Sequence, residues 1–210
     1  MAGATELRRV GGACATRTYA ADTRTLTIDF SPTNCLCPDR YYWRGKIMVH
    51  FTGTSLTYYS GAVVTLESYF VNDNQHMATR TFTDLSNGSY SVDVANGSVI
   101  FAKGGTHTWT VHCDYARMAG CGTPLALDDV SSVTGQSAGT NRKGVNYTAA
   151  ITKPPIKRGD CYKYYVAGVV TLENSKGNIL LIDYDPSGFQ ACHNTASVTS
   201  NSWTKIIILH

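Results

Sequence analysis

The residues with the greatest capacity for chemistry in this chain gather in one stretch, DYDPSGFQACHN, at positions 183–194. The first half follows the spacing of a calcium-binding loop, in which the first, third, fifth and sixth positions are Asp183, Asp185, Ser187 and Gly188. The twelfth position is Asn194, however, where such a loop needs a bidentate carboxylate. The stretch therefore favours a type I turn with Pro186 at its second position. A looser calcium site at Asp183 and Asp185 is the alternative.

The same stretch ends on Cys192 and His193, residue types that serve as thiol nucleophiles or metal ligands. Because neighbours in an extended chain point in opposite directions, these two side chains diverge and are not expected to form a dyad. His107 and His112 are an odd number of positions apart on one expected strand, so they face opposite sides of it. The cysteines include no CxxC pair of a zinc site. We therefore expect no catalysis and, apart from the weak calcium site, no cofactor.

Cysteine usage is informative about the compartment. Seven cysteines in a background rich in Thr, Tyr, Gly, Ser and Asn are typical of a secreted β protein with a partial disulfide framework. The expected pairs are Cys161 with Cys192, Cys113 with Cys121, and Cys14 with either Cys35 or Cys37. The odd count leaves at least one cysteine free or paired with another chain.

Aromatic residues offer a second kind of site. The stretches DRYYWRG and SLTYYSG place five rings in or near expected loops, namely Tyr41, Tyr42, Trp43, Tyr58 and Tyr59. Flat rings stack on sugar faces, so these residues form a candidate platform for a glycan or another small ligand. Adjacent aromatics on a strand point to opposite faces, and the alternative is that these rings pack in the core and at sheet edges.

Length and charge limit the remaining possibilities. At 210 residues, 43% of them hydrophobic, the chain is long enough for one domain with a real core. The net charge of +3 is small and the basic residues are scattered, which argues against a nucleic-acid partner. No apolar run is long enough to span a bilayer.

Residues 1–13 form a polar lead without the apolar segment of a secretory signal, and we expect this lead to be poorly structured. Residues 14–210 are expected to form a single domain.

The elements that position these residues are expected to be strands. Period-two alternation dominates, as in TLTIDF at 25–30, GKIMVHF at 45–51 and THTWTVHCDY at 106–115. Short turns such as NDN, SNG and KGG separate the alternating runs, which favours antiparallel hairpins. The sequence predicts an all-β fold of about a dozen strands, either a β-sandwich or a rolled meander. Gly168 is expected at a bend or bulge of one long strand.

The last expected strand, SWTKIIILH, is short, apolar and terminal. If it lies at the edge of a sheet, it can pair with another chain. Its KIIIL segment is apolar on both faces, which is equally typical of a strand inside the same sheet. Both interpretations are open at this point.

Several stretches resemble a family of uncharacterised secreted or lipid-anchored proteins of Bacteroidota. The most specific are YFVNDN at 69–74 and GTNRKGVNYTA at 139–149, accompanied by CYKYYVAGVV at 161–170 and ACHNTASV at 191–198. The resemblance implies an all-β fold and a surface or periplasmic setting, and it carries over no catalytic residues.

These observations together favour a secreted or cell-surface domain with a structural or adhesive role, which binds itself or other surface proteins. The alternative is a module that binds carbohydrates or small ligands through its Tyr and Trp loops.

Overall fold

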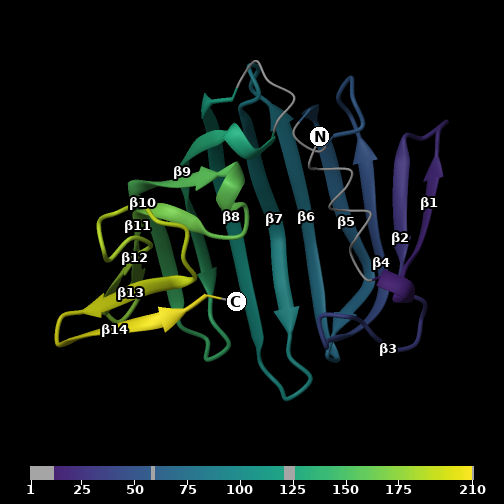
Figure 1. The fold of residues 1–210 in the computed structure, drawn as a ribbon. Helices are drawn as coiled ribbons and strands as arrows, with labels where there is room; N and C mark the ends of the chain where they lie inside the picture. Colours follow the sequence, from purple (N-terminus) through teal and green to yellow (C-terminus); the bar gives the residue numbers. More distant parts are fainter. Residues whose placement is uncertain (1–11, 58–59, 121–125, 210) are drawn as a thin grey trace.

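The computed structural model describes residues 12–57, 60–120 and 126–209. Within these ranges the chain is all-β and forms one 14-stranded antiparallel sheet (Figure 1). The strands are β1 (Thr16–Ala20), β2 (Thr25–Asp29), β3 (Cys35–Leu36), β4 (Tyr42–Phe51), β5 (Ala62–Val71), β6 (Asn74–Asp84), β7 (Tyr90–Ile100), β8 (Thr106–Ala119), β9 (Val130–Thr140), β10 (Asn146–Arg158), β11 (Tyr165–Asn174), β12 (Ile179–Asp183), β13 (Thr195–Ser200) and β14 (Trp203–Ile208).

The sheet is a meander, in which each strand pairs with its neighbours along the chain and only β3 lies off the path, beside β4. Short antiparallel connections of this kind are what the frequent turn signals require. Because all the described strands belong to one sheet, the rolled meander is the correct expectation and the sandwich of two packed sheets is wrong.

Within the described ranges, three short 3₁₀ helices accompany the sheet, namely η1 (Gly12–Cys14), η3 (Ala126–Asp128) and η4 (Gly159–Cys161). None of the described helices has the length and apolar composition needed to cross a membrane. The expected N-terminal lead, residues 1–13, lies mostly outside the described residues. Its last two residues already belong to η1, which is tied to the strands through Cys14.

The two faces of the sheet differ in composition. One face carries most of the large buried side chains and is called the core face here, with Ile28, Val49 and Val133 among its members. The opposite face is called the threonine face and is rich in partly or fully exposed threonines such as Thr81, Thr110 and Thr148. Side chains alternate between the two faces along each strand, and the pairing register is unshifted over long stretches. The core-face residues and the threonine-face residues therefore each stay on one face from strand to strand.

The tightest packing lies at the N-terminal end of the sheet. Ile28, Phe30, Cys37 and Tyr69 form one buried cluster, and Trp43 packs against it. The rings of Phe30 and Trp43 have centroids 5.2 Å apart, and Trp43 meets Tyr69 edge-on at 5.8 Å. Such aromatic arrangements add to the free energy gained by burial alone.

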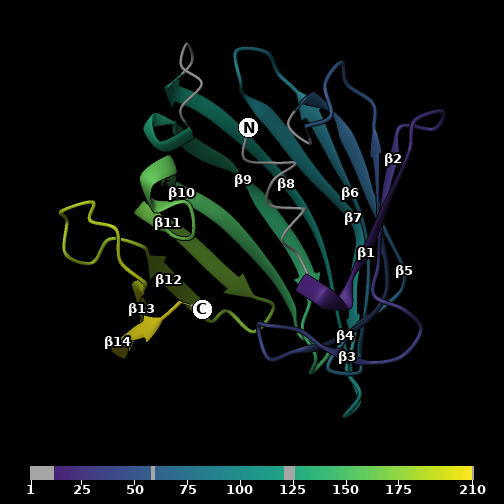
Figure 2. The same cartoon turned by 45° about the vertical axis from the view of Figure 1, so that its right-hand side comes forward.

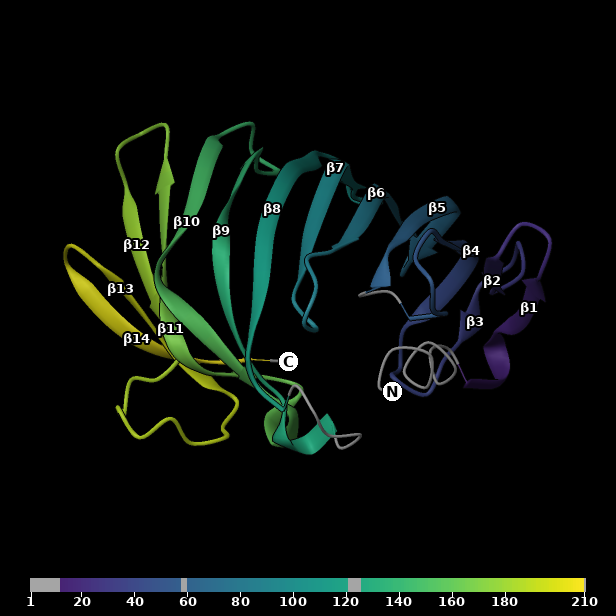
Figure 3. The same ribbon diagram turned by 90° about the horizontal axis from the view of Figure 1, so that it is seen from above.

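The sheet curves into an open arch when seen from above (Figure 3). β1 lies at one end of the arch and β14 at the other, and the turned view in Figure 2 agrees. The meander therefore has two edge strands, and in the described part of the chain neither has a second pairing partner.

Gly168 lies where β10 and β11 depart from regular register, as the sequence predicts. The pairing shifts between Ile151 and Ile156, and Gly168 adopts a φ of +117°. A Cβ atom at this position would lie 2.3 Å from the Cα atom of Pro155. Glycine is therefore required by both the backbone conformation and the close approach of β10.

Candidate functional site

The stretch 183–194 contains the expected turn. The Gly188 N–H donates to the Asp185 carbonyl at 3.0 Å, which closes a four-residue turn with Pro186 at its second position. The turn lies within the loop between β12 and β13 and does not join the two strands as a tight hairpin.

The carboxylates of this loop are used by the loop itself. Asp183 accepts a hydrogen bond from the Asp185 N–H at 2.9 Å. Asp185 accepts from the Ser187 hydroxyl and from the Gln190 N–H, both at 3.0 Å. Desolvation by itself would raise the pKa of Asp185, but the backbone and hydroxyl donors around it outweigh this effect and lower the pKa. Asp185 thus serves as the cap of the loop.

A calcium site at Asp183 and Asp185 gains no further ligands from this arrangement. No group of three or more His, Cys, Asp or Glu side chains within the described ranges is placed to hold a metal ion. His193, the nearest additional candidate, has its Nε2 atom 3.9 Å from Asp185 Oδ1, and its Nδ1 atom contacts Thr195. The geometry of the loop is therefore that of a turn whose own carboxylates accept hydrogen bonds from its backbone and its serine.

The cysteines form two of the expected disulfides. Cys161 bonds to Cys192, and Cys14 takes Cys35 in preference to Cys37. A Cys192 thiol is therefore unavailable for a Cys–His dyad. Cys37 is a buried free thiol, and Cys113 is a second free thiol on the core face of β8. The expected pairing of Cys113 with Cys121 is not present, since Cys113 is free; Cys121 itself lies outside the described residues.

The aromatic platform is divided between the surface and the interior. Tyr41 and Tyr42 are about half exposed, whereas Trp43 is partly buried against the core cluster. Alternation along β4 turns Trp43 to the core face, so it packs as the alternative interpretation predicts, and Tyr41 and Tyr42 are the described members of the platform that face the surface. Tyr58 and Tyr59 lie outside the described residues.

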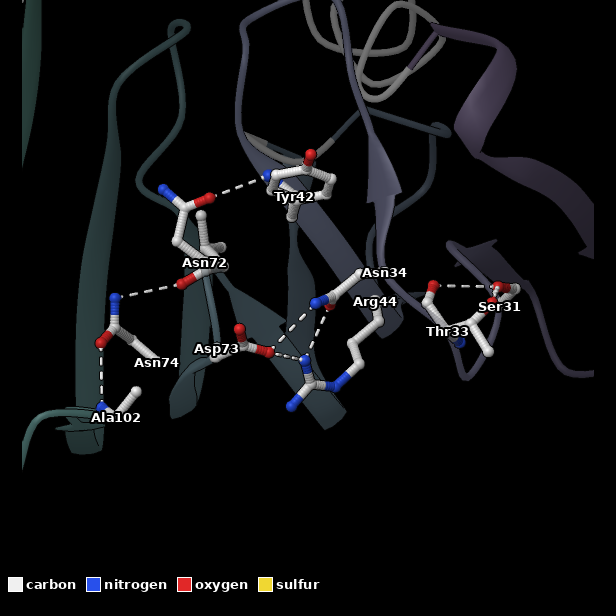
Figure 4. A network of polar contacts seen from close by, with 10 residues as sticks. Ser31, Thr33, Asn34, Tyr42, Arg44, Asn72, Asp73, Asn74 and Ala102 are labelled. Carbon is white, nitrogen blue, oxygen red and sulfur yellow. Dashed lines mark hydrogen bonds and ion pairs between the residues drawn. The ribbon is translucent and has the colours of Figure 1, made fainter.

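A polar network lies beside Tyr42 at the ends of β4, β5 and β6 (Figure 4). Arg44 donates to Asn34 Oδ1 at 2.7 Å and forms an ion pair with Asp73, and its guanidinium lies 3.8 Å from the centre of the Phe70 ring. The hydrogen bond from Arg44 lowers the pKa of Asp73. Because the amide and carboxylate oxygens already accept hydrogen bonds here, the network fixes the loops more readily than it offers groups to a sugar.

One serine motif of the sequence was not predicted as a candidate site. GQSAG at 135–139 matches the G-x-S-x-G pattern of serine hydrolases, in which the serine sits on a sharp turn between a strand and a helix. Here the motif lies in the middle of β9, paired on both sides with β8 and β10. Ser137 is hydrogen-bonded to Tyr147, whose hydroxyl lies 2.8 Å from His107 Nε2. With its backbone engaged in sheet pairing on both sides, the motif does not form the strand-to-helix turn of the hydrolase pattern.

His112 forms a cluster of titratable side chains with two aspartates on the threonine face. Its Nδ1 atom lies 2.7 Å from Asp93 and its Nε2 atom 3.6 Å from Asp114. The hydrogen bond to Asp93 is the main cause that raises the pKa of His112 above its ordinary value of 6.5. Spacing alone places His112 and Asp114 on one face, but the contact with Asp93 depends on the register of β7 against β8.

Replacing Asp93 with asparagine is expected to lower the pKa of His112. Since folding raises this pKa, protonated His112 contributes stability that is fully present below pH 6.5 and is lost as the pH rises through the folded-state pKa. Titration of the imidazole by NMR in the wild type and in Asp93→Asn measures the change. Asp84→Asn, which removes a carboxylate of β6, is the matched control and should leave His112 unchanged. Identical titration curves in all three proteins would show that the contact is absent in solution.

The edge strand β14 presents an exposed apolar surface at one end of the sheet. All six of its residues are exposed, including Trp203 at 44%, Ile206 at 61% and Ile208 at 61%. Among the described strands, β13 is its only partner. An apolar edge strand of this kind presents unpaired backbone groups to another strand.

Comparison with known proteins adds no functional information. No family model matches the chain, and neither the curated proteins nor the solved structures contain a match.

Proposed function

We propose that this protein is a secreted or cell-surface structural domain that assembles with a second copy of itself through strand β14. The observation that carries this proposal is the exposure of every β14 side chain at the end of the arch. The two disulfides support an oxidising compartment, in which such bonds persist.

A two-fold pairing of β14 with its copy is favourable in a register that covers most of the strand and keeps the two Lys205 side chains apart. When the two-fold axis is perpendicular to the sheet, each residue stays on the same face in both copies. Residues directly opposite each other share a face, so their two residue numbers are both even or both odd. Pairing centred on Ile206 sets this residue against Ile206 of the copy and Ile208 against Thr204. Lys205, the one charged residue of β14, then faces Ile207 and not a second lysine. The face of the joined sheet that carries Ile206 and Ile208 is then mainly apolar, and the opposite face pairs each Lys205 with an isoleucine.

The other edge strand is a poorer partner. β1 has five residues, TRTYA, and includes Arg17 and two threonines. Short, charged edge strands resist pairing with other chains. Apolar complementarity therefore favours β14 against β14, which closes into a dimer, over β1 against β14, which would extend into a filament.

Ile206→Lys is expected to convert a dimer into a monomer. In the symmetric pair the two lysines would stand directly opposite each other, and the contact between two isoleucines would be lost. Because edge pairing covers only part of each Ile206 side chain, the loss is smaller than that of full burial, and the substitution should weaken association by about 10-fold or more. Analytical ultracentrifugation over a range of protein concentrations measures the dissociation constant.

Leu36→Lys is the matched control, since Leu36 is a comparably exposed aliphatic residue at 57% but lies on β3, far from β14 along the sheet. It should leave the dimer intact. A wild-type protein that sediments as a monomer at all concentrations would overturn the proposal, as would a dimer that Ile206→Lys does not weaken.

A further inference from the structure

A hollow of about 170 Å³ opens on the core face of β8–β11, away from β14 and from the N-terminal cluster. Its lining residues are Cys113, Val133, Gly135, Gln136, Ser137, Ala149, Ile151, Pro155, Tyr165, Val170 and Tyr184. The aliphatic side chains and two tyrosine rings dominate this lining. None of the lining residues carries a charge at neutral pH.

The hollow exists because small residues meet across three neighbouring strands. Gly135 lies opposite Cys113, and Ser137 lies opposite Ala149. Gly135 has a φ of +146°, and a Cβ atom there would lie 2.2 Å from the His112 carbonyl oxygen. A larger side chain is therefore excluded at this position, and the space above it stays open.

Two aromatic rings form one wall of the hollow. Tyr165 and Tyr184 meet edge-to-face, with centroids 5.2 Å apart. Burial raises the pKa of both phenols, so both rings are neutral at physiological pH. Tyr165 is also hydrogen-bonded to Tyr115, which holds its ring in place. The Cys113 thiol is a further soft, weakly polar surface, of the kind that aromatic rings contact favourably.

The size and chemistry of this lining define what would fill it. An engineered apolar cavity of about 150 Å³ in another protein binds benzene, so the present volume accommodates one or two fused rings. A lining without charge disfavours ions, and its few polar groups do not match the many hydroxyls of a sugar. We propose that the hollow binds a small, uncharged aromatic molecule, edge-on to Tyr165 and Tyr184. This site is independent of the proposed assembly through β14.

Indole is the probe for this site, and isothermal titration calorimetry is the measurement. For a ligand of this size we expect saturable binding with a dissociation constant of about 1 mM or tighter. Ala149→Leu fills the hollow and should weaken binding at least about 10-fold. Ala150→Leu is the matched control, because it makes the same change one residue along β10, on the exposed threonine face. It should bind indole as the wild type does.

Alkylation of the Cys113 thiol is a second measurement. It uses the wild-type protein and so does not depend on whether a variant folds. Bound indole should slow alkylation of this thiol, with the labelled position assigned by peptide mass spectrometry. Saturable binding lost in Ala149→Leu, together with protection of Cys113, supports the proposal. Absence of saturable binding to the wild type overturns it, and so does equal binding by Ala149→Leu. If Ala149→Leu does not fold, unchanged alkylation of wild-type Cys113 in saturating indole overturns it.

Discussion

Replacement of Cys161 and Cys192 together by alanine is expected to lower the free energy of unfolding by about 3 to 4 kcal/mol. The bond closes a loop across a sequence separation of 31 residues, and its loss restores that chain entropy to the unfolded state. It also anchors η4 to the loop that Asp185 caps. Urea denaturation of the oxidised wild type and the double variant measures the difference.

Cys113→Ala is the control for the disulfide prediction, because it removes a free thiol without opening a loop. Cys113→Ala should lower the free energy of unfolding far less than the double replacement does. A double variant within about 1 kcal/mol of the wild type would contradict the expected role of the bond. The size of this effect bears on location, because a protein that depends on its disulfides is best suited to an oxidising compartment.

Phe30→Ala is expected to destabilise the protein by about 3 to 5 kcal/mol. Phe30 is 0% exposed, and its ring contacts those of Trp43 and Tyr69. Truncation therefore leaves a cavity that the surrounding strands cannot easily fill. For a domain of this size the melting temperature should fall by roughly 6 to 20 °C, which differential scanning calorimetry measures.

Phe189→Ala provides the comparison for Phe30. Phe189 is 84% exposed in the loop after β12, and its removal should change stability by less than about 0.5 kcal/mol. Equal melting temperatures for Phe30→Ala and the wild type would show that the N-terminal cluster does not stabilise the sheet.

Local patterns were sufficient to predict much of the fold. The alternation in TLTIDF correctly places Ile28 and Phe30 on the core face, and THTWTVHCDY correctly separates His107 from His112. The turn at Asp185 and the bend at Gly168 were also predicted, and both are confirmed. These features depend on the period of the strand or on the φ of one residue, and such properties are set by neighbours in the chain.

Features that depend on contacts between distant residues were predicted less well. Cys14 had two candidate partners, and only the paired structure selects Cys35. Trp43 was assigned to a surface platform because loop and strand boundaries near Tyr42 are not defined by the sequence. The hollow beside Tyr165 was not predicted, since it requires Gly135 and Ala149 to lie side by side with both tyrosines.

The sequence by itself determined that this protein is all-β, which residues face the core, and where the turns fall. These properties follow from alternation and turn chemistry within a few residues of each position. Only the tertiary structure decided that the strands form one open sheet, that β14 lies at its edge and that His112 meets Asp93. The apolar pattern of β14 is equally compatible with an internal strand, and strand order and register arise from pairings between segments far apart in the chain.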